Sequence, residues 1–279
     1  MEKLLKWSLQ SASHDSSSGQ PAPRPDPELM AQLFGAPDDA QLMKDALAVA
    51  TNPEATIENR ETALDNLEML IENLDNANNL ESMKMWPDVL ALLDDEHETI
   101  RKMALWVVGT AVQNNPKSQE NLSSHKGSIE KIMALTDDKD VEVRLKALYA
   151  LNSALSHCEP TYQKFEANNG WELVKKVISS DTDKVLLRGL TLLQAVTCSE
   201  PVASKFKAAR DNAVIEPLIT VLKTGSANAR EKALNVSSAL YQAKFEFTQD
   251  ELEDIRLARR KIIDDSDGSY SAIDFPLDD

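Results

Sequence analysis

Apolar residues recur at helical spacing in the stretch VEVRLKALYALNSAL, residues 141–155. Val143, Ala147, Leu151 and Leu155 follow one another at intervals of four, which places them on one face of an amphipathic helix. The pattern therefore predicts a helix over 141–155 that buries this face against neighbouring elements.

The same apolar pattern returns along the chain, and each copy begins with an arginine. The five arginines are 41, 43, 44 and 42 positions apart, and a leucine stands four positions after every one of them. They are Arg60, Arg101, Arg144, Arg188 and Arg230. An internal repeat of this length predicts stacked helical units, each of which is buried only by its neighbours.

Two shorter segments separate successive arginine helices. The first follows a proline, which suits the first turn of a helix, and we expect Gly127 and Gly170 to form the left-handed turn that closes it, with Asn212 in that role in the next copy. The prolines are Pro116, Pro160 and Pro201. Three helices in about 42 residues are armadillo-like. The sequence thus predicts an all-α fold, a right-handed armadillo-repeat solenoid of about four to five three-helix repeats over residues 26–245.

The amino-terminal part of the chain has a different composition. Residues 1–10 carry a short apolar motif, and the serine-rich and proline-rich residues that follow predict a flexible segment over 1–25. We expect a short helix that ends at Phe34-Gly35, and Asp38 or Asp39 as the cap of the next.

The carboxyl-terminal part, residues 246–279, is predicted to be a capping helix followed by an acidic tail. Thr248 and Glu251 have the spacing of a capping box. We expect the basic side chains of this helix to face the acidic end of the solenoid.

The formal net charge of −16 changes the range of possible partners. Nucleic acid and anionic membranes would repel such a protein at long range, so a protein partner is expected. Two cysteines, no secretory signal and no apolar run of membrane-spanning length favour a cytoplasmic protein. We expect a monomer.

Catalytic and metal-binding motifs are not evident in the sequence. There is no glycine-rich phosphate loop, and His157-Cys158 has no second pair of residues at ligand spacing. The sequence therefore predicts a protein that is not an enzyme and that holds no cofactor or metal.

Two groups of residues are candidates for a partner-binding surface. Asparagines crowd the stretch 73–79, where they weaken a helix and serve either as caps or as a surface. Trp106 and Tyr149 occupy equivalent positions 43 apart, and they either line the concave wall or fill the core.

Several strings carry a more specific resemblance. IENLDNANNL at 71–80, GTAVQNNPKSQENL at 109–122, the opening MEKLLKWSL and the segment PDPELMAQLFG resemble the fungal Fes-type nucleotide exchange factors, relatives of the animal Hsp70-binding proteins. The resemblance covers nearly the whole chain. It implies a non-catalytic adaptor whose concave face embraces one lobe of the nucleotide-binding domain of a cytosolic DnaK-type chaperone and accelerates ADP release.

The resemblance also suggests a contact surface. The positions that match its motifs are Glu72, Asn73, Asp75, Asn76, Gln113 and Asn114, and some of these could instead fix the bend between repeats. Together with Glu68, Trp106 and Tyr149 they form the predicted chaperone-binding surface.

Leu4, Leu5, Trp7 and Leu9 support a second hypothesis. This apolar segment between lysines is similar to the peptides that a chaperone's client cleft accepts, so it could assist client release. The alternative is that it docks on the first repeat of its own solenoid. The rival function for the whole chain is an armadillo scaffold or transport adaptor that binds a linear peptide.

Overall fold

The computed structural model describes residues 38–266, and every regular element in that range is a helix. The segment 1–25, the short helix expected to end at Phe34-Gly35 and the acidic tail beyond 266 lie outside the described residues. The prediction of an all-α fold is confirmed for the described range.

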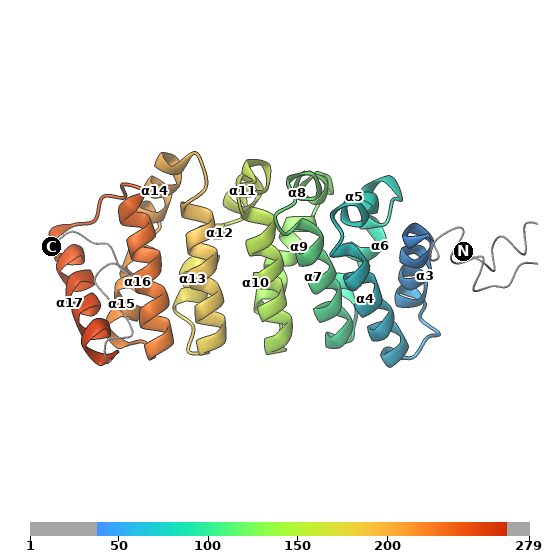
Figure 1. The fold of residues 1–279 in the computed structure, drawn as a ribbon, viewed down its shortest axis with the longest axis horizontal. Helices are drawn as coiled ribbons and strands as arrows, with labels where there is room; N and C mark the ends of the chain where they lie inside the picture. Colours follow the sequence, from blue (N-terminus) through green and yellow to red (C-terminus); the bar gives the residue numbers. More distant parts are fainter. Residues whose placement is uncertain (1–37, 267–279) are drawn as a thin grey trace, which may run out of the picture.

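The helices repeat as triplets of two short helices and one long helix (Figure 1). The long helices are α4 Ile57–Ile71, α7 Glu98–Val112, α10 Val141–Leu155, α13 Asp183–Thr197 and α16 Ala227–Gln242. The first short helices are α5 Leu74–Ser82, α8 Pro116–Ser124, α11 Glu159–Ala167 and α14 Val202–Asp211. The second short helices are α6 Trp86–Ala91, α9 Ser128–Ala134, α12 Gly170–Ile178 and α15 Ile215–Thr224, with 3₁₀ turns η1 Leu92–Asp94 and η2 Leu135–Asp137 after α6 and α9.

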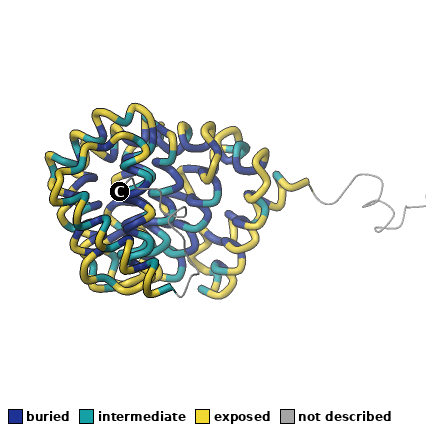
Figure 2. The backbone as a smooth tube through the Cα atoms, turned by 60° about the vertical axis from the view of Figure 1, so that its left-hand side comes forward, coloured by how far each residue is buried: buried dark blue, intermediate teal, exposed yellow. Residues whose placement is uncertain are grey.

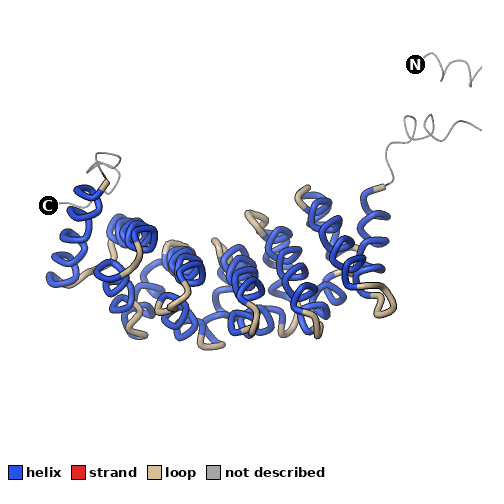
Figure 3. The backbone as a smooth tube through the Cα atoms, turned by 90° about the horizontal axis from the view of Figure 1, so that it is seen from below, coloured by secondary structure: helices blue, strands red, loops and turns tan. Residues whose placement is uncertain are grey.

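Four complete triplets, α5 to α16, therefore lie between a leading pair and a closing helix. The leading pair is α3 Asp39–Thr51 with α4, and the closing helix is α17 Gln249–Asp265. The stack is curved, with the long helices side by side on its inner, concave side (Figure 3). Helix α3 packs on α4 much as α4 packs on α7, so it extends the inner row by one helix.

Buried residues occur in every unit along the stack rather than at one centre (Figure 2). The leucines four positions after the arginines have no exposed surface. They are Leu64, Leu105, Leu148, Leu192 and Leu234. Burial of one such side chain stabilises the fold by about 1.5–3 kcal/mol, so the repeated leucine is the centre of each unit's core.

Two of the repeated arginines, Arg60 and Arg101, link successive units at one edge of the stack. Arg60 donates to the carboxylate of Asp95, 2.5 Å away, and Arg101 donates to both carboxylate oxygens of Asp138, at 2.8 and 3.0 Å. Each aspartate lies in the turn that precedes the next long helix. Arg101 also donates to the carbonyl of Asp95, and Arg144 to that of Asp138, each at 2.8 Å. Arg101 and Arg144 therefore each satisfy a carbonyl of their own unit. Arg60 and Arg101 also hold the next unit through a carboxylate.

These contacts set the ionisation of the two aspartates. Burial raises the pKa of the Asp138 carboxyl, but the hydrogen bond from Arg101, the amide of Asp140 and the charge of Arg101 together hold it below its usual value. For Asp95, burial is likewise outweighed by the amide of His97 and by Arg60, so that its pKa is also lowered.

Of the three residues predicted to form left-handed turns, only Gly127 has a positive φ. Gly127 has φ of 79°, as predicted, but the equivalent residues in the next two copies are Asn169 at 60° and Ala213 at 52°, not Gly170 and Asn212. Gly170 is required for another reason, since a Cβ there would lie 2.3 Å from the Phe165 ring. The glycine therefore allows close packing, and the strained backbone lies one residue earlier.

The closing helix begins at Thr248 with the capping box that the sequence predicts. Two ion pairs that join it to the solenoid run opposite to the expectation, however. Arg210 of α14 donates to both carboxylate oxygens of Glu251, and Lys223 of α15 pairs with Asp254 at 2.6 Å. The acidic side of α17 faces basic residues of the last repeat.

Asp138→Asn is expected to destabilise the protein at neutral pH by about 1–3 kcal/mol, because it removes the charge on which Arg101 depends. The pKa of Asp138 is lower in the folded than in the unfolded chain. Its contribution is therefore complete at neutral pH and is lost as the pH falls below about 4, through the folded value. Urea denaturation at several pH values measures the difference between the two proteins, which should shrink in acid.

Asp137→Asn is the matched control, because this neighbouring carboxylate is 59% exposed and pairs only with Lys176 at the surface. It should change stability by no more than about 0.5 kcal/mol. Equal losses for the two variants would show that the buried Arg101–Asp138 pair has no more weight than the exposed pair beside it.

Candidate functional site on the concave face

Two aromatic rings and a lysine lie together in the middle of the concave face. Trp106 on α7 and Tyr149 on α10 are both partly exposed. The Lys146 ammonium lies 3.5 Å from the centroid of the Trp106 ring and 5.7 Å from that of Tyr149. Lys146 and Tyr149 are three positions apart on α10 and so share one helix face. The structure therefore places both rings on the inner wall, with a cation between them.

Two hollows flank Lys146. One, of about 700 Å³, lies between α7, α10 and α13, and the other, of about 500 Å³, lies between α4, α7 and α10. Trp106, Glu142 and Lys146 line both. The concave face thus has one continuous polar groove with an aromatic and basic centre.

The charge along this groove changes sign. The hollow nearer the amino-terminal end is lined by Glu58, Glu61 and Asp65, whereas the other is lined by Lys184 and Arg188. The groove therefore presents an acidic half and a basic half to a partner.

Lys146 lies at the boundary between the two halves. Burial lowers its pKa, as do the charges of Arg188 and Lys102, while Glu68 and Glu142 act in the opposite direction. A partly desolvated ammonium that other cations already surround would gain from an acidic group on a partner.

A chain of hydrogen bonds connects three long helices below this groove. The Thr110 hydroxyl donates to the carboxylate of Glu68 at 2.6 Å and lies 3.4 Å from the Tyr149 hydroxyl. The Tyr149 hydroxyl in turn donates to the side-chain oxygen of Gln113 at 3.0 Å. Glu68 is only 5% exposed. It belongs to the frame that orients Tyr149 rather than to the exposed surface, whereas Gln113 is exposed and accessible.

The asparagine-rich segment has largely internal roles. Asn73 caps α5 by accepting from the amide of Asp75 at 2.9 Å. Asn76 is 7% exposed and donates to Asp39 and to the carbonyl of Leu70. Of the two roles considered for these asparagines, the structure therefore places Asn73 as a cap and Asn76 as a link to α3.

The remaining predicted residues lie in or directly after the turns that follow two long helices. Glu72 is exposed between α4 and α5, Asp75 is exposed in the first turn of α5, and Asn114 is exposed between α7 and α8 with φ of 52°. These turns occupy equivalent places in neighbouring units, so their polar side chains extend the candidate surface along one edge of the concave face.

Sequence reasoning missed Lys146, Thr110 and Arg188 as members of this site. The equivalent positions in the other four copies hold Thr62, Met103, Leu190 and Lys232, of which only Met103 and Leu190 are buried, so the repeat gives no consistent signal for Lys146.

Leu4, Leu5, Trp7 and Leu9 lie outside the described residues. Across residues 38–266, no three His, Cys, Asp or Glu side chains come close enough to hold a metal ion, and no helix has the length and apolarity to cross a membrane. The Cys158 sulfur lies 3.2 Å from the Thr161 hydroxyl, within its own helix turn.

Comparison with known families identifies two adjoining regions. The family described as nucleotide exchange factor Fes1 matches residues 1–80, and the SIL1/FES1/HPBP1 C-terminal domain matches residues 76–217.

Curated relatives match over almost the whole chain. A protein of Scheffersomyces stipitis is 42% identical over 90% of this chain and 89% of its own length, and one of Kluyveromyces lactis is 40% identical over 94% and 93%. A Saccharomyces cerevisiae protein is 38% identical over 90% of both chains. Each of the three is named Hsp70 nucleotide exchange factor FES1.

Solved structures support the fold. A designed armadillo repeat protein in complex with the peptide (KR)4 aligns with a TM-score of 0.66 at 15% identity, covering 82% of this chain and 93% of its own. A second designed armadillo repeat protein aligns with the same score at 14% identity and the same coverage. The predicted armadillo-repeat fold is thus confirmed, and the family matches and relatives together show that the chain belongs to the Fes1 family of nucleotide exchange factors.

Proposed function

We propose that this protein is a non-catalytic co-chaperone that binds the nucleotide-binding domain of an Hsp70 chaperone and accelerates the release of ADP. The observation that carries the proposal is the group of relatives named Hsp70 nucleotide exchange factor FES1, which are about 40% identical over some nine-tenths of the chain.

The concave face supports this proposal because it offers what a large protein partner needs. Trp106 and Tyr149 are partly exposed aromatic anchors, and such residues dominate the binding energy of many interfaces. They stand on long helices packed side by side, so the surface is formed before binding and loses little conformational entropy. A curved groove of this kind can hold one lobe of a two-lobed domain.

Binding of one lobe acts on the nucleotide through thermodynamic linkage. We propose that the protein binds the open arrangement of the two lobes better than the closed one. A preference of about 100-fold would weaken ADP binding by up to the same factor, about 2.7 kcal/mol. No bond is made or broken, so the chain needs only a surface that distinguishes the two arrangements.

Lys146→Gln tests the site. The change removes the ammonium between Trp106 and Tyr149 but keeps a long polar side chain, and we expect about tenfold weaker chaperone binding, equivalent to about 1.4 kcal/mol. Stopped-flow release of a labelled ADP from Hsp70, measured over a range of exchange-factor concentrations, gives the concentration required for half-maximal acceleration. That concentration should rise about tenfold.

Lys117→Gln is the control, because Lys117 is exposed on the short helix α8 and the variant has the same change in net charge. It should leave the half-maximal concentration unchanged. If both lysine variants matched the unmodified protein, the concave site would be wrong. If the unmodified protein did not accelerate ADP release at all, the peptide-binding scaffold or adaptor would be the better account.

We also propose that the amino-terminal segment assists client release. Leu4, Leu5, Trp7 and Leu9 lie between or beside lysines, which is a suitable composition for a client cleft, and their attachment to a bound solenoid gives a high local concentration.

Deletion of residues 1–25 tests this role. We expect the release of a fluorescent client peptide from Hsp70 to slow at least several-fold while the acceleration of ADP release is retained, because the concave groove begins only at α3 and α4. Both reactions are followed in the same stopped-flow experiment. Unchanged client release would contradict the proposal, whereas a parallel loss of both activities would place the segment in nucleotide exchange instead.

A further inference from the structure

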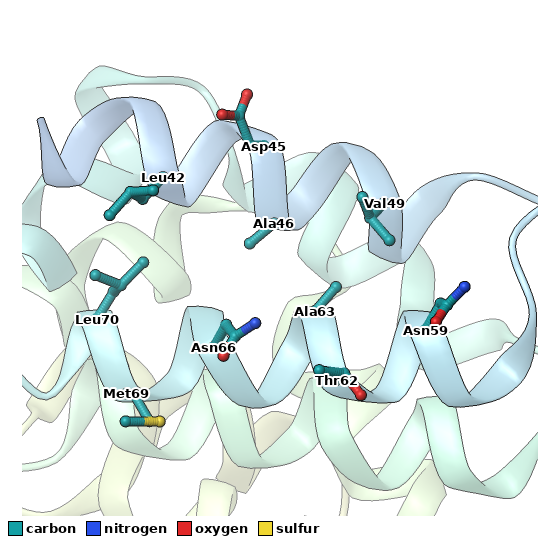
Figure 4. Close-up of a pocket in the computed structure, with 10 residues that line it drawn as sticks. All are labelled: Leu42, Asp45, Ala46, Val49, Asn59, Thr62, Ala63, Asn66, Met69 and Leu70. Carbon is teal, nitrogen blue, oxygen red and sulfur yellow. The ribbon is translucent and has the colours of Figure 1, made fainter. Parts of the chain in front are cut away.

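The amino-terminal end of the concave row has an apolar groove that differs from the charged hollows around Lys146. It lies between α3 and α4 and has a volume of about 800 Å³. Figure 4 shows Leu42, Ala46 and Val49 of α3 pointing toward α4, where Ala63 and Leu70 face them. The groove is therefore a trough between two helices with apolar residues on both walls.

This groove concentrates exposed apolar surface. Leu42 is 37% exposed, Val49 41% and Met69 63%, and these are three of the five large apolar side chains exposed within residues 38–266. Such side chains are normally scattered singly over a surface, whereas a cluster indicates a place where something binds.

The beginning of the described chain lies beside this groove. Asp38 caps α3, and Leu42 is the fourth residue of that helix, so the preceding 37 residues enter about one helical turn from the groove. The groove is thus next to the end of the described chain that continues into the apolar motif of residues 1–10.

We propose that residues 1–10 of the same chain bind in the α3–α4 groove in the free protein. The segment supplies four large apolar side chains within six positions, Leu4, Leu5, Trp7 and Leu9, to a trough with apolar walls. This inference concerns the protein without a partner and does not depend on whether the segment displaces client.

The charges of the two surfaces are complementary. The segment carries Lys3 and Lys6 against a single acid, Glu2. Asp45 lines the groove. Thr62 of α4 lines both this groove and the neighbouring hollow. The acidic residues of that hollow, Glu58, Glu61 and Asp65, also belong to α4. A second copy of this chain, with a net charge of −16, would instead meet long-range repulsion.

The connection is long enough and favours the intramolecular contact. Residues 11–37 number 27, and 27 fully extended residues span at most about 90 Å, whereas Leu42 and Val49 lie only about 10 Å apart along α3. A tethered ligand has an effective concentration of about 1 mM, so a groove with a Kd of about 0.1 mM would be occupied about nine-tenths of the time. Weak intrinsic affinity is therefore sufficient.

Site-specific photo-crosslinking in the full-length chain tests the proposal. The photoreactive residue p-benzoylphenylalanine replaces Met69, whose exposed side chain tolerates a larger group, and the dilute protein is irradiated without any partner. Mass spectrometry should find crosslinks from position 69 to residues 1–10 in material of monomer mass. The same residue in place of Leu257, which is 55% exposed on α17, should give at least about tenfold fewer such crosslinks.

Matched variants identify the groove as the site. Ala46→Gln fills the trough, whereas Ala48→Gln alters an exposed position of the same helix that does not line it. The first should lower the crosslink yield at least about fivefold and the second should leave it unchanged. Leu5→Ser with Trp7→Ser should lower the yield equally and leaves the solenoid unaltered.

Two results would overturn the proposal. Equal yields from positions 69 and 257 would show that the segment does not prefer the groove. Crosslinks found only in material of dimer mass would show that a second copy occupies it.

Discussion

Each three-helix unit of this protein buries its apolar face only against its neighbours, so the relation between successive units decides the shape of the whole. The repeated leucines fill the interior of each unit, but the turns before the long helices leave backbone carbonyls that need donors. Arg101 satisfies the carbonyl of Asp95 in its own unit and the carboxylate of Asp138 in the next. Arg60 makes the corresponding bond to the carboxylate of Asp95, so two of the five repeated arginines join successive units in this way.

The curvature that results brings side chains from three long helices to one surface. Trp106, Lys146 and Arg188 come from α7, α10 and α13, and they meet only because these helices are adjacent in the inner row. The hydrogen bonds from Glu68 through Thr110 to Tyr149 cross the same row and hold one of its rings in place. A recognition surface on packed helices is more rigid than one on loops, which suits the proposed preference for one arrangement of a partner over another.

Much of this architecture could be predicted from the sequence, because the repeat expresses local rules. Helix type, unit length, the Thr248 capping box and the burial of the repeated leucine all depend on residues close in sequence. The features that were missed depend on contacts between units. Burial of Glu68 is decided by Thr110 in the next long helix. The direction of the α17 ion pairs likewise depends on α14 and α15, which no local pattern of α17 reveals.

The most direct test of the account is the equilibrium affinity of this protein for the nucleotide-binding domain of Hsp70, measured by calorimetry with and without saturating ADP. Linkage requires the two ligands to weaken each other equally. The account predicts that ADP lowers the affinity for this protein by the same factor, up to about 100-fold, by which this protein lowers the affinity for ADP. Equal affinities with and without nucleotide would contradict it.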